Sequence, residues 1–330
     1  MNTRLPFTIQ GVGSALPEKV MTNADFEKYL ETSDEWIRAR TGIRERRICC
    51  NGENALTLGV SASQSALERA GLEPSDIDLI IVATSTPYVP LPATACYLQA
   101  QLGCRQVPAF DLAAACSGFV YAMASAVGLM HTGTYRHALI VGSEAMSAIT
   151  DFSDRTTCVL LGDGAGAAVL GPATDDVSGV YDCLLGADGT GAEAIFIPAG
   201  GSRLPASSDT VHERLHFLKM RGREVYKFAV LKMAEVIRGA VDRVGIDLDD
   251  LAIVIPHQSN ARIIESAVER LGLPMDRVLI NIDKYGNTSA ASIPLGLDDA
   301  ATMGRIRKGD WVLLAGFGGG LTWGSVLLRW

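Results

Sequence analysis

The stretch ALERAGL at residues 66–72, followed by DIDLII at residues 76–81, decides the fold because the chain carries it twice. The second copy is AVDRVGI at residues 240–246, followed by DLAIVI at residues 250–255, so that residue 240 lies 174 positions after residue 66. Each copy predicts an amphipathic helix that ends at a glycine, then a short acidic loop and a buried strand. The sequence therefore predicts two similar α/β units.

The same offset relates a third pair of segments, RHALIVG at residues 136–142 and DWVLLAG at residues 310–316. Strands that alternate with helices in both halves are typical of α/β folds. Glycine, proline and aspartate gather at residues 171–176, which indicates a boundary there. We therefore divide the chain into halves at 1–175 and 176–330.

The composition is that of a protein with a large buried core. Of the 330 residues 48% are hydrophobic and 20% are charged, and the formal net charge at pH 7 is −8. An acidic chain lacks the concentrated basic surface of a general nucleic-acid-binding protein. Apolar runs such as residues 79–83 and 311–315 are too short to span a bilayer and predict buried strands. We expect neither nucleic acid nor a membrane as a partner.

The seven cysteines indicate neither a disulfide framework nor a metal site, because their number is odd and no C-x-x-C pair occurs. His212 and His216 lie four residues apart, but no third ligand accompanies them. Residues 1–4 lack the charged-then-apolar pattern of a secretion signal. We expect a cytoplasmic protein that holds no metal.

One cysteine differs from the others in its context. Cys116 lies in DLAAACSGF at residues 111–119, between a strand-like stretch and a helix rich in small residues. Most lone cysteines are inert small hydrophobic residues. At a helix N-terminus, however, unpaired backbone N–H groups and the helix dipole favour the thiolate, which is the nucleophilic form. The pattern predicts a nucleophile at Cys116.

The repeat brings two polar residues of the second half toward Cys116. Residue 290, its counterpart, lies inside GNTSAAS at residues 286–292, and His257 follows the second copy of the buried strand. Taken alone, His257 is more often a structural histidine and Asn287 a turn residue. Because ligands of such sheets bind where strand ends meet, we expect Cys116, His257 and Asn287 to form one catalytic site between the halves.

The motifs along nearly the whole chain resemble those of the β-ketoacyl-acyl carrier protein synthase III family, whose members have the thiolase-like fold. They are SDEWI at residues 33–37, TGIRER at 41–46, the Cys116 loop, GDGAGA at 162–167, HQSNAR at 257–262, YGNTS at 285–289 and GFGGGLTWG at 316–324. Elongating synthases of the wider superfamily carry a second histidine, and thiolases a second cysteine, where this chain has Asn287. The asparagine indicates the priming branch.

The resemblance implies duplicated βαβαβ halves in five layers, α-β-α-β-α. It also implies an acyltransferase that initiates fatty acid biosynthesis. Cys116 would store the acyl group of an acyl-CoA primer, and this group would then condense with malonyl-acyl carrier protein as carbon dioxide leaves, which gives a 3-oxoacyl-acyl carrier protein. Coenzyme A thioester is then a substrate, and no cofactor is expected.

The resemblance also assigns roles in the reaction. The backbone N–H groups of Cys116 and Gly319 would form the oxyanion hole. His257 and Asn287 would donate hydrogen bonds to the thioester oxygen of the malonyl group during decarboxylation. Loss of either donor should impair decarboxylation more than acyl transfer.

Four further residues would bind coenzyme A. Trp36, which alone would be read as a core residue, stacks by resemblance on the adenine, with Arg155 on the other face. Arg40 would lie near the phosphates, since a guanidinium pairs well with phosphate, and Asn260 at the pantetheine arm.

An acidic carrier protein needs a local basic patch on this acidic chain. The candidates are Arg262, Lys227 and Arg270, joined by Arg221 and Arg223. A solvated helix face would explain these charges equally well, except at Arg262, whose motif position matches. Binding through such a patch weakens as salt rises.

The acyl pocket is assigned to Leu91, Met220 and Phe317. By resemblance, Leu91 reaches from a partner subunit to close the pocket, and a leucine leaves more room there than the aromatic residue of several members. The stretch at residues 200–209, before Met220, is longer than usual. The resemblance implies a homodimer, for which we expect a buried central strand near residues 107–112.

Three alternatives stay open. A relative in specialised metabolism would condense other acyl groups or transfer them to an alcohol or amine. A cysteine hydrolase is a second alternative, since papain-like enzymes also use Cys, His and Asn, but the duplicated halves and the predicted CoA residues argue against it. The third is a silent scaffold that binds the carrier protein, which would not need an intact Cys116, His257 and Asn287.

Overall fold

Each half of the chain builds one large β-sheet and one two-stranded sheet in this computed structural model, which describes residues 4–330. The first sheet has the order β1-β7-β6-β4-β5, and the second has the order β11-β12-β13-β8. The first contains β1 (Phe7–Ala15), β4 (Leu79–Ala83), β5 (Ala109–Leu112), β6 (Ala138–Glu144) and β7 (Gly164–Pro172). The second contains β8 (Gly179–Ala187), β11 (Leu251–Pro256), β12 (Trp311–Gly318) and β13 (Thr322–Arg329). Residue 175 falls between β7 and β8.

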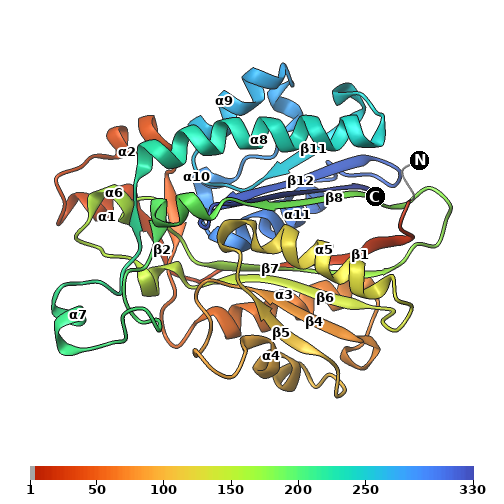
Figure 1. The fold of residues 1–330 in the computed structure, drawn as a ribbon, viewed down its shortest axis with the longest axis horizontal. Coiled ribbons are helices and arrows are strands. Elements are labelled where there is room, and N and C mark those ends of the chain that lie inside the picture. The colour runs from red at the N-terminus through yellow and green to blue at the C-terminus, as the bar shows by residue number, and fades with distance from the viewer. Residues whose placement is uncertain (1–3) are drawn as a thin grey trace.

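Helices cover both sheets and fill the space between them, as Figure 1 shows. Helices α3 (Ala55–Ala70) and α4 (Thr94–Leu102) pack on the outer face of the first sheet, and α8 (Gly222–Val244) on that of the second, with α9 (Ala261–Leu271) beside α8. Helices α5 (Gly118–Met130) and α11 (Ser292–Thr302) form the central layer and contact both sheets. This arrangement confirms the predicted five-layered α/β fold.

The structure repeats with the offset that the sequence predicts. The glycines that end α3 and α8, Gly71 and Gly245, both have left-handed backbone, with φ of 64° and 80°. The short 3₁₀ turns before α5 and α11, Ala115–Ser117 and Ser289–Ala291, also lie 174 residues apart. Their first residues both have positive φ, 46° at Ala115 and 50° at Ser289, which non-glycine residues rarely adopt. The two central helices therefore begin with the same backbone geometry.

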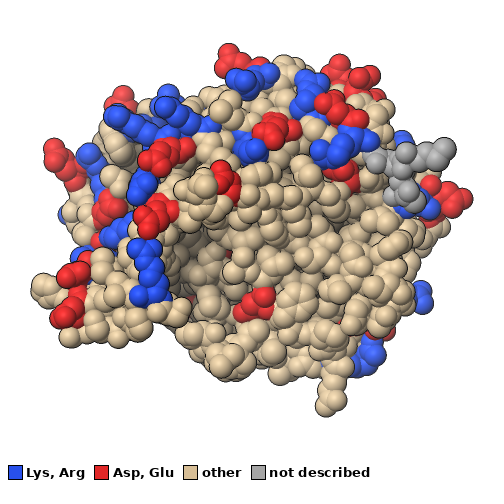
Figure 2. All heavy atoms as spheres, viewed as in Figure 1, with Lys and Arg blue, Asp and Glu red and all other residues tan. Residues whose placement is uncertain are grey.

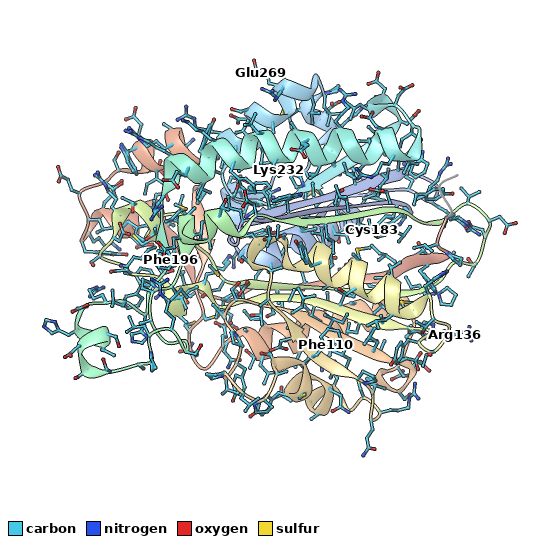
Figure 3. All side chains as sticks on the ribbon, in the orientation of Figure 1. Phe110, Arg136, Cys183, Phe196, Lys232 and Glu269 are labelled. Atoms are coloured by element: carbon cyan, nitrogen blue, oxygen red, sulfur yellow. The ribbon has the colours of Figure 1, made fainter. Side chains whose placement is uncertain are left out.

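The halves differ at the edge of the sheets. The residues that correspond to β5 fall in helix α10 (Ile282–Tyr285), so the second sheet has one strand fewer. In the described part of the chain only β4 pairs with β5, and the residues of β5, among them Phe110 (Figure 3), are half-buried. Within the described residues β5 is therefore an edge strand. The central strand expected near residues 107–112 belongs to the expected homodimer and stays a prediction.

The smaller elements lie at one end of the sheets, around the carboxyl ends of β4 and β11. They are β2 (Val20–Thr22), α1 (Asn23–Glu27), α2 (Asp34–Thr41), β3 (Glu45–Arg47), α6 (Arg155–Cys158), β9 (Ile195–Phe196), α7 (Ser208–His212) and β10 (Lys219–Met220). The long stretch at residues 200–209 leads into α7, which projects from the body of the molecule in Figure 1. Among residues 4–330, no helix is both long and apolar enough to cross a membrane.

Candidate active site

Cys116 lies at the N-terminal end of the central helix α5, in the turn that follows β5. Its side chain is partly exposed and lines a cavity of ≈ 320 Å³ between the two halves. Gly318, at the end of β12, packs directly against it: a Cβ atom on Gly318 would lie 2.7 Å from the backbone nitrogen of Cys116. Only glycine fits there, because any side chain would meet this backbone.

The protein environment disfavours the thiolate form of Cys116. Burial raises the pKa of this thiol to about 12; a hydrogen bond with Ser289 lowers it in part, and the carboxyl group of Glu144 raises it. Removal from water thus opposes the favourable helix terminus, and the expectation of a thiolate stays a prediction. The thiol must lose its proton when it attacks a substrate.

His257 follows β11 and is held as a neutral ring. Its side chain is buried, with Nδ1 2.7 Å from Oγ of Ser292 on α11. That hydroxyl also accepts the backbone N–H of Gln258 at 3.4 Å. When the hydroxyl donates its own proton to Nδ1, the ring proton lies on Nε2. Burial lowers the pKa of His257 to about 3, so the imidazole is an uncharged donor at neutral pH.

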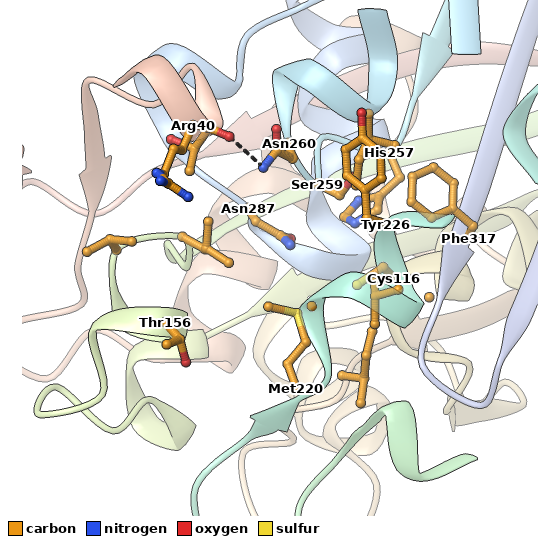
Figure 4. Close-up of a pocket in the computed structure, with 18 of the residues that line it drawn as sticks. Arg40, Cys116, Thr156, Met220, Tyr226, His257, Ser259, Asn260, Asn287 and Phe317 are labelled. Atoms are coloured by element: carbon orange, nitrogen blue, oxygen red, sulfur yellow. Dashed lines mark hydrogen bonds between the residues drawn. The ribbon is translucent and has the colours of Figure 1, made fainter. Parts of the chain in front are cut away.

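Asn287 is fixed through both its backbone and its side chain. Its backbone N–H donates to Leu160 at 2.8 Å, and its carbonyl accepts the N–H of Gly162 at 3.0 Å. The side-chain oxygen Oδ1 accepts the backbone N–H of Ser289 at 2.9 Å. Because Oδ1 faces the backbone of Ser289, the amide nitrogen points into the cavity, as Figure 4 shows.

The three predicted catalytic residues thus come together on one cavity. Cys116, His257 and Asn287 all line it, each from a different loop at the inner ends of the sheets (Figure 4). The ring of Phe317 meets that of His257 edge-on, with centroids 5.3 Å apart. A nucleophile therefore faces two neutral hydrogen-bond donors across a largely apolar space.

The cavity extends from Cys116 to Trp36 on α2. Two guanidinium groups, of Arg40 and Arg155, each lie 4.8 Å from the centre of the indole ring, a cation–π distance. Asn260 lies between the two ends of the cavity and begins α9: its Oδ1 accepts the N–H of Arg262 at 2.9 Å, and its Nδ2 donates to the carbonyl of Arg40 at 3.1 Å (Figure 4).

Comparison with known proteins identifies the family. Family models of 3-oxoacyl-[acyl-carrier-protein] synthase III and of its C-terminal part match residues 110–189 and 241–330. The chain is 50% identical over 320 residues, 97% of each chain, to a β-ketoacyl-[acyl-carrier-protein] synthase III of Roseiflexus sp.. The chain belongs to the 3-oxoacyl-[acyl-carrier-protein] synthase III family. The resemblance predicted from its motifs is confirmed.

Solved synthase III structures agree over the full length. The enzyme of Aquifex aeolicus has 44% identity and a TM-score of 0.91, covering 98% of this chain and 100% of its own. A priming β-ketosynthase of a polyketide biosynthetic pathway has 37% identity and a TM-score of 0.91, covering 100% of this chain and 98% of its own. The fold is therefore that of condensing enzymes.

The other site residues predicted from the sequence fall into three groups: residues at the cavity, a residue away from it, and exposed basic residues. Met220 and Phe317 line the cavity, and Gly319 follows Gly318 at its edge. Leu91 lies away from the cavity, 85% exposed. The basic candidates Lys227, Arg262 and Arg270 are exposed, as are Arg221 and Arg223. Figure 2 shows basic side chains gathered on the side of the molecule that carries α8 and α9, interleaved with acidic ones.

Sequence reasoning missed the residues that complete the site. Beside Cys116 a second, smaller cavity is lined by Met146, Leu161 and Leu218, together with residues already named. No sequence signal marks these apolar residues, since they resemble any core residue. Ser292 was also missed, although its place in the repeat, opposite Gly118, could have indicated a polar role.

Proposed function

We propose that this chain initiates fatty acid biosynthesis by transferring an acyl group from acyl-CoA to Cys116 and condensing it with malonyl-acyl carrier protein. One observation carries this proposal: a cysteine at a helix N-terminus shares a cavity with two neutral donors, His257 and Asn287, and this cavity extends to an indole flanked by arginines. The relatives at about 50% identity are named for this reaction.

In the first half-reaction, Sγ of Cys116 forms a bond to the acyl carbon while the bond from that carbon to the sulfur of CoA breaks. The thiol proton ends on the CoA that leaves. The developing oxyanion would accept hydrogen bonds from the backbone N–H groups of Cys116 and Gly319. Gly319 follows Gly318, which packs closely against the backbone of Cys116. Because the pKa of Cys116 is raised, the thiol must lose its proton as its bond to the acyl carbon forms.

In the second half-reaction, the malonyl thioester loses carbon dioxide and leaves an enolate. Nε2–H of His257 and the amide N–H of Asn287 would donate to the thioester oxygen, where the negative charge develops. A neutral histidine suits this role, because it donates a hydrogen bond without giving up a proton. The enolate carbon then attacks the acyl carbonyl, and Cys116 leaves as thiolate and recovers a proton.

Coenzyme A would bind along the cavity toward Trp36. The indole ring and the guanidinium of Arg155 offer flat faces for the adenine, and Arg40 offers a charge for phosphate. Arg155 already lies over the indole in the unliganded chain, so adenine would enter between them or displace the arginine. The carrier protein would approach from the side of Arg262, Lys227 and Arg270, which are exposed.

The chain would act as a cytoplasmic homodimer. The free edge of β5 can pair with the same strand of a second copy, which would turn it into the central strand expected from the sequence. The exposed Leu91 would then reach the acyl pocket of the partner, which explains why a leucine with 85% exposure lies outside its own cavity.

Intact-protein mass spectrometry tests this function. The protein and a Cys116→Ala variant are mixed with acyl-CoAs from acetyl to long-chain and branched. An acyl adduct on the native protein alone, which clears with release of carbon dioxide when malonyl-acyl carrier protein is added, is the expected result. No adduct from any acyl-CoA overturns the proposal.

A priming synthase of a specialised pathway is the second candidate, favoured by the 37% identity to a priming β-ketosynthase of a polyketide pathway. The same experiment separates the two. An adduct that reacts with the carrier protein of fatty acid synthesis supports the first, and one that reacts only with another acceptor, such as an alcohol or amine, supports a specialised role.

A further inference from the structure

Two segments distant in sequence both line the small cavity beside Cys116. Residues 146–157 contribute Met146 and Thr157, and residues 208–220 contribute Leu218 and Met220. The second segment contains α7 and follows directly on the stretch at residues 200–209 that the sequence marks as unusually long. An acyl chain on Cys116 would enter the space between these segments. The contacts that hold the two segments in place therefore affect the width of this space.

An ion pair between Asp151 and Arg214 joins the two segments. The side chain of Asp151 is 6% exposed, and that of Arg214 is 50% exposed. Nε of Arg214 donates to Oδ2 of Asp151 at 2.9 Å, and its NH2 group donates to Oδ1, so the contact is bidentate. This ion pair holds the pKa of the Asp151 carboxyl below its usual range. Lys219 adds a longer contact at 3.9 Å.

The backbone at Arg214 is strained, and the residues after it contact the segment that holds Asp151. Arg214 has a positive φ of 56°, which is unfavourable for a non-glycine residue and must be compensated by its contacts. Its guanidinium lies 5.1 Å from the ring centre of Phe217. The next residue, Leu218, donates its N–H to the carbonyl of Ile149 at 2.9 Å. The strained turn thus directs Leu218 onto the segment that holds Asp151.

On its other side the segment is tied to a short ribbon. Met220 pairs with Ile195, and Lys219 with Phe196, which Figure 3 marks. This ribbon lies on the cavity, since Ile195 and Met220 both line it. The Asp151–Arg214 pair therefore acts together with the hydrogen bond from Leu218 to Ile149 in holding the outer end of this segment against the segment that carries Met146.

We propose that Asp151 and Arg214 are a positioning pair that sets the width of the acyl cavity and thereby the length of the primer that Cys116 accepts. Neither residue touches the substrate; they act through Leu218 and Met220. Because a single methylene in an apolar pocket changes selectivity by roughly tenfold or more, a small displacement of this wall suffices. The inference rests on the proposed transfer of an acyl group to Cys116.

The test compares Arg214→Gln, Asp151→Asn and the double variant with the native protein. Rates of adduct formation are measured for acyl-CoAs of increasing length, and the ratio of long-chain to short-chain rates is the readout. We expect this ratio to rise by roughly tenfold in each single variant, and by no more in the double variant, since both changes remove the same contact. Arg214→Lys, which keeps the charge, should restore part of the native ratio.

Arg203→Gln is the matched control, because Arg203 lies in the long stretch just before this segment and pairs with Glu193 at 3.0 Å on the surface, in place of Asp151. This control should keep the native ratio. A uniform loss of rate for all primers in the Asp151 and Arg214 variants, with the ratio unchanged, would overturn the inference, since it would mean that the pair contributes to stability alone.

A second readout does not need the acyl-transfer activity. N-alkylmaleimides of increasing chain length are reacted with the same variants, and modification of the peptide that contains Cys116 is quantified. The ratio of long to short reagent should rise in the variants and stay native in Arg203→Gln; an unchanged ratio again overturns the inference. If the native protein takes no acyl group, the proposed function fails, and the maleimide ratio still decides the role of the pair.

Discussion

The N-termini of the two central helices have the same backbone geometry and different surroundings. Each begins after a turn whose first residue has positive φ, at Ala115 in one half and Ser289 in the other. Each of the three candidate catalytic residues occurs in one copy only and has an alanine as its counterpart: Cys116 with Ala290, His257 with Ala83, and Asn287 with Ala113. The duplication thus supplies a shape twice, while the chemistry is divided between the halves and yields one site.

What faces each helix N-terminus explains why only one of them is open. Glu144, at the end of β6, corresponds to Gly318 at the end of β12. The buried carboxyl group of Glu144 lies against the N-terminus of α11, 3.4 Å from the N–H of Ala290, and accepts several further hydrogen bonds from the loop after β4. Gly318 places no side chain against the backbone of Cys116. A buried carboxyl group, whose pKa is raised by burial, therefore faces one helix N-terminus, and a glycine faces the other.

The largest effect should come from making the first copy resemble the second. We expect Cys116→Ala to abolish the acyl adduct and to lower condensation by roughly 10⁴-fold or more, since the nucleophile is lost. Adding Ala290→Cys to this variant should restore no adduct, because residue 290 is 1% exposed and faces Glu144 instead of the cavity. Mass spectrometry with acyl-CoA checks both; an adduct on residue 290 would contradict the comparison.

A smaller effect should follow from removing a donor of the second half. Asn287→Ala, which copies Ala113, should lower malonyl decarboxylation by roughly 10²-fold to 10³-fold. The rate of adduct formation should change only a few-fold, since in the proposed role the amide donates to the malonyl thioester and not to the primer. Release of carbon dioxide and adduct mass, measured on the same preparation, separate the steps. Equal losses in both steps would count against the assigned role.

The pH dependence of Cys116 sharpens the contrast between Glu144 and Gly318. Because burial raises the pKa of the thiol to about 12, its alkylation rate should rise by about tenfold per pH unit across the neutral and mildly alkaline range. Glu144→Gln should move the profile to lower pH, since the carboxyl group of Glu144 raises this pKa. Alkylation of the Cys116 peptide from pH 7 to pH 10 checks this. An unchanged profile would mean that residue 144 carries no charge.

The smallest effect should come from Ser292, whose counterpart is Gly118. Ser292→Ala removes the hydroxyl that holds Nδ1 of His257 and should lower decarboxylation by about tenfold, in keeping with the loss of one buried hydrogen bond. Ser61→Ala, which removes a surface hydroxyl on α3, is the control and should have no effect. Recovery of the rate in Ser292→Thr would support the hydrogen bond as the cause; a native rate in Ser292→Ala would exclude it.

The sequence predicted the candidate catalytic residues, but it predicted only some of the residues that form the cavity around them. The repeat predicted that His257 and Asn287 lie near Cys116, because residues at equal offsets in duplicated units occupy equivalent places. The apolar wall made by Met146, Leu161 and Leu218 could not be predicted, since apolar residues of this kind occur throughout the core. Likewise, the pairing of Asp151 with Arg214 joins loops whose approach no local pattern encodes.

By itself, the sequence determined the duplicated α/β fold, the family and the three residues that meet between the halves, because periodicity, helix-ending glycines and local motifs are properties of neighbouring residues. Only the tertiary structure decided the ionisation of Cys116 and His257, the exposed edge of β5 and the limits of the acyl cavity. A helix N-terminus favours a thiolate locally, but the cost of removing charge from water depends on everything packed around it. That packing comes from residues far apart in the chain, so it exists only after folding.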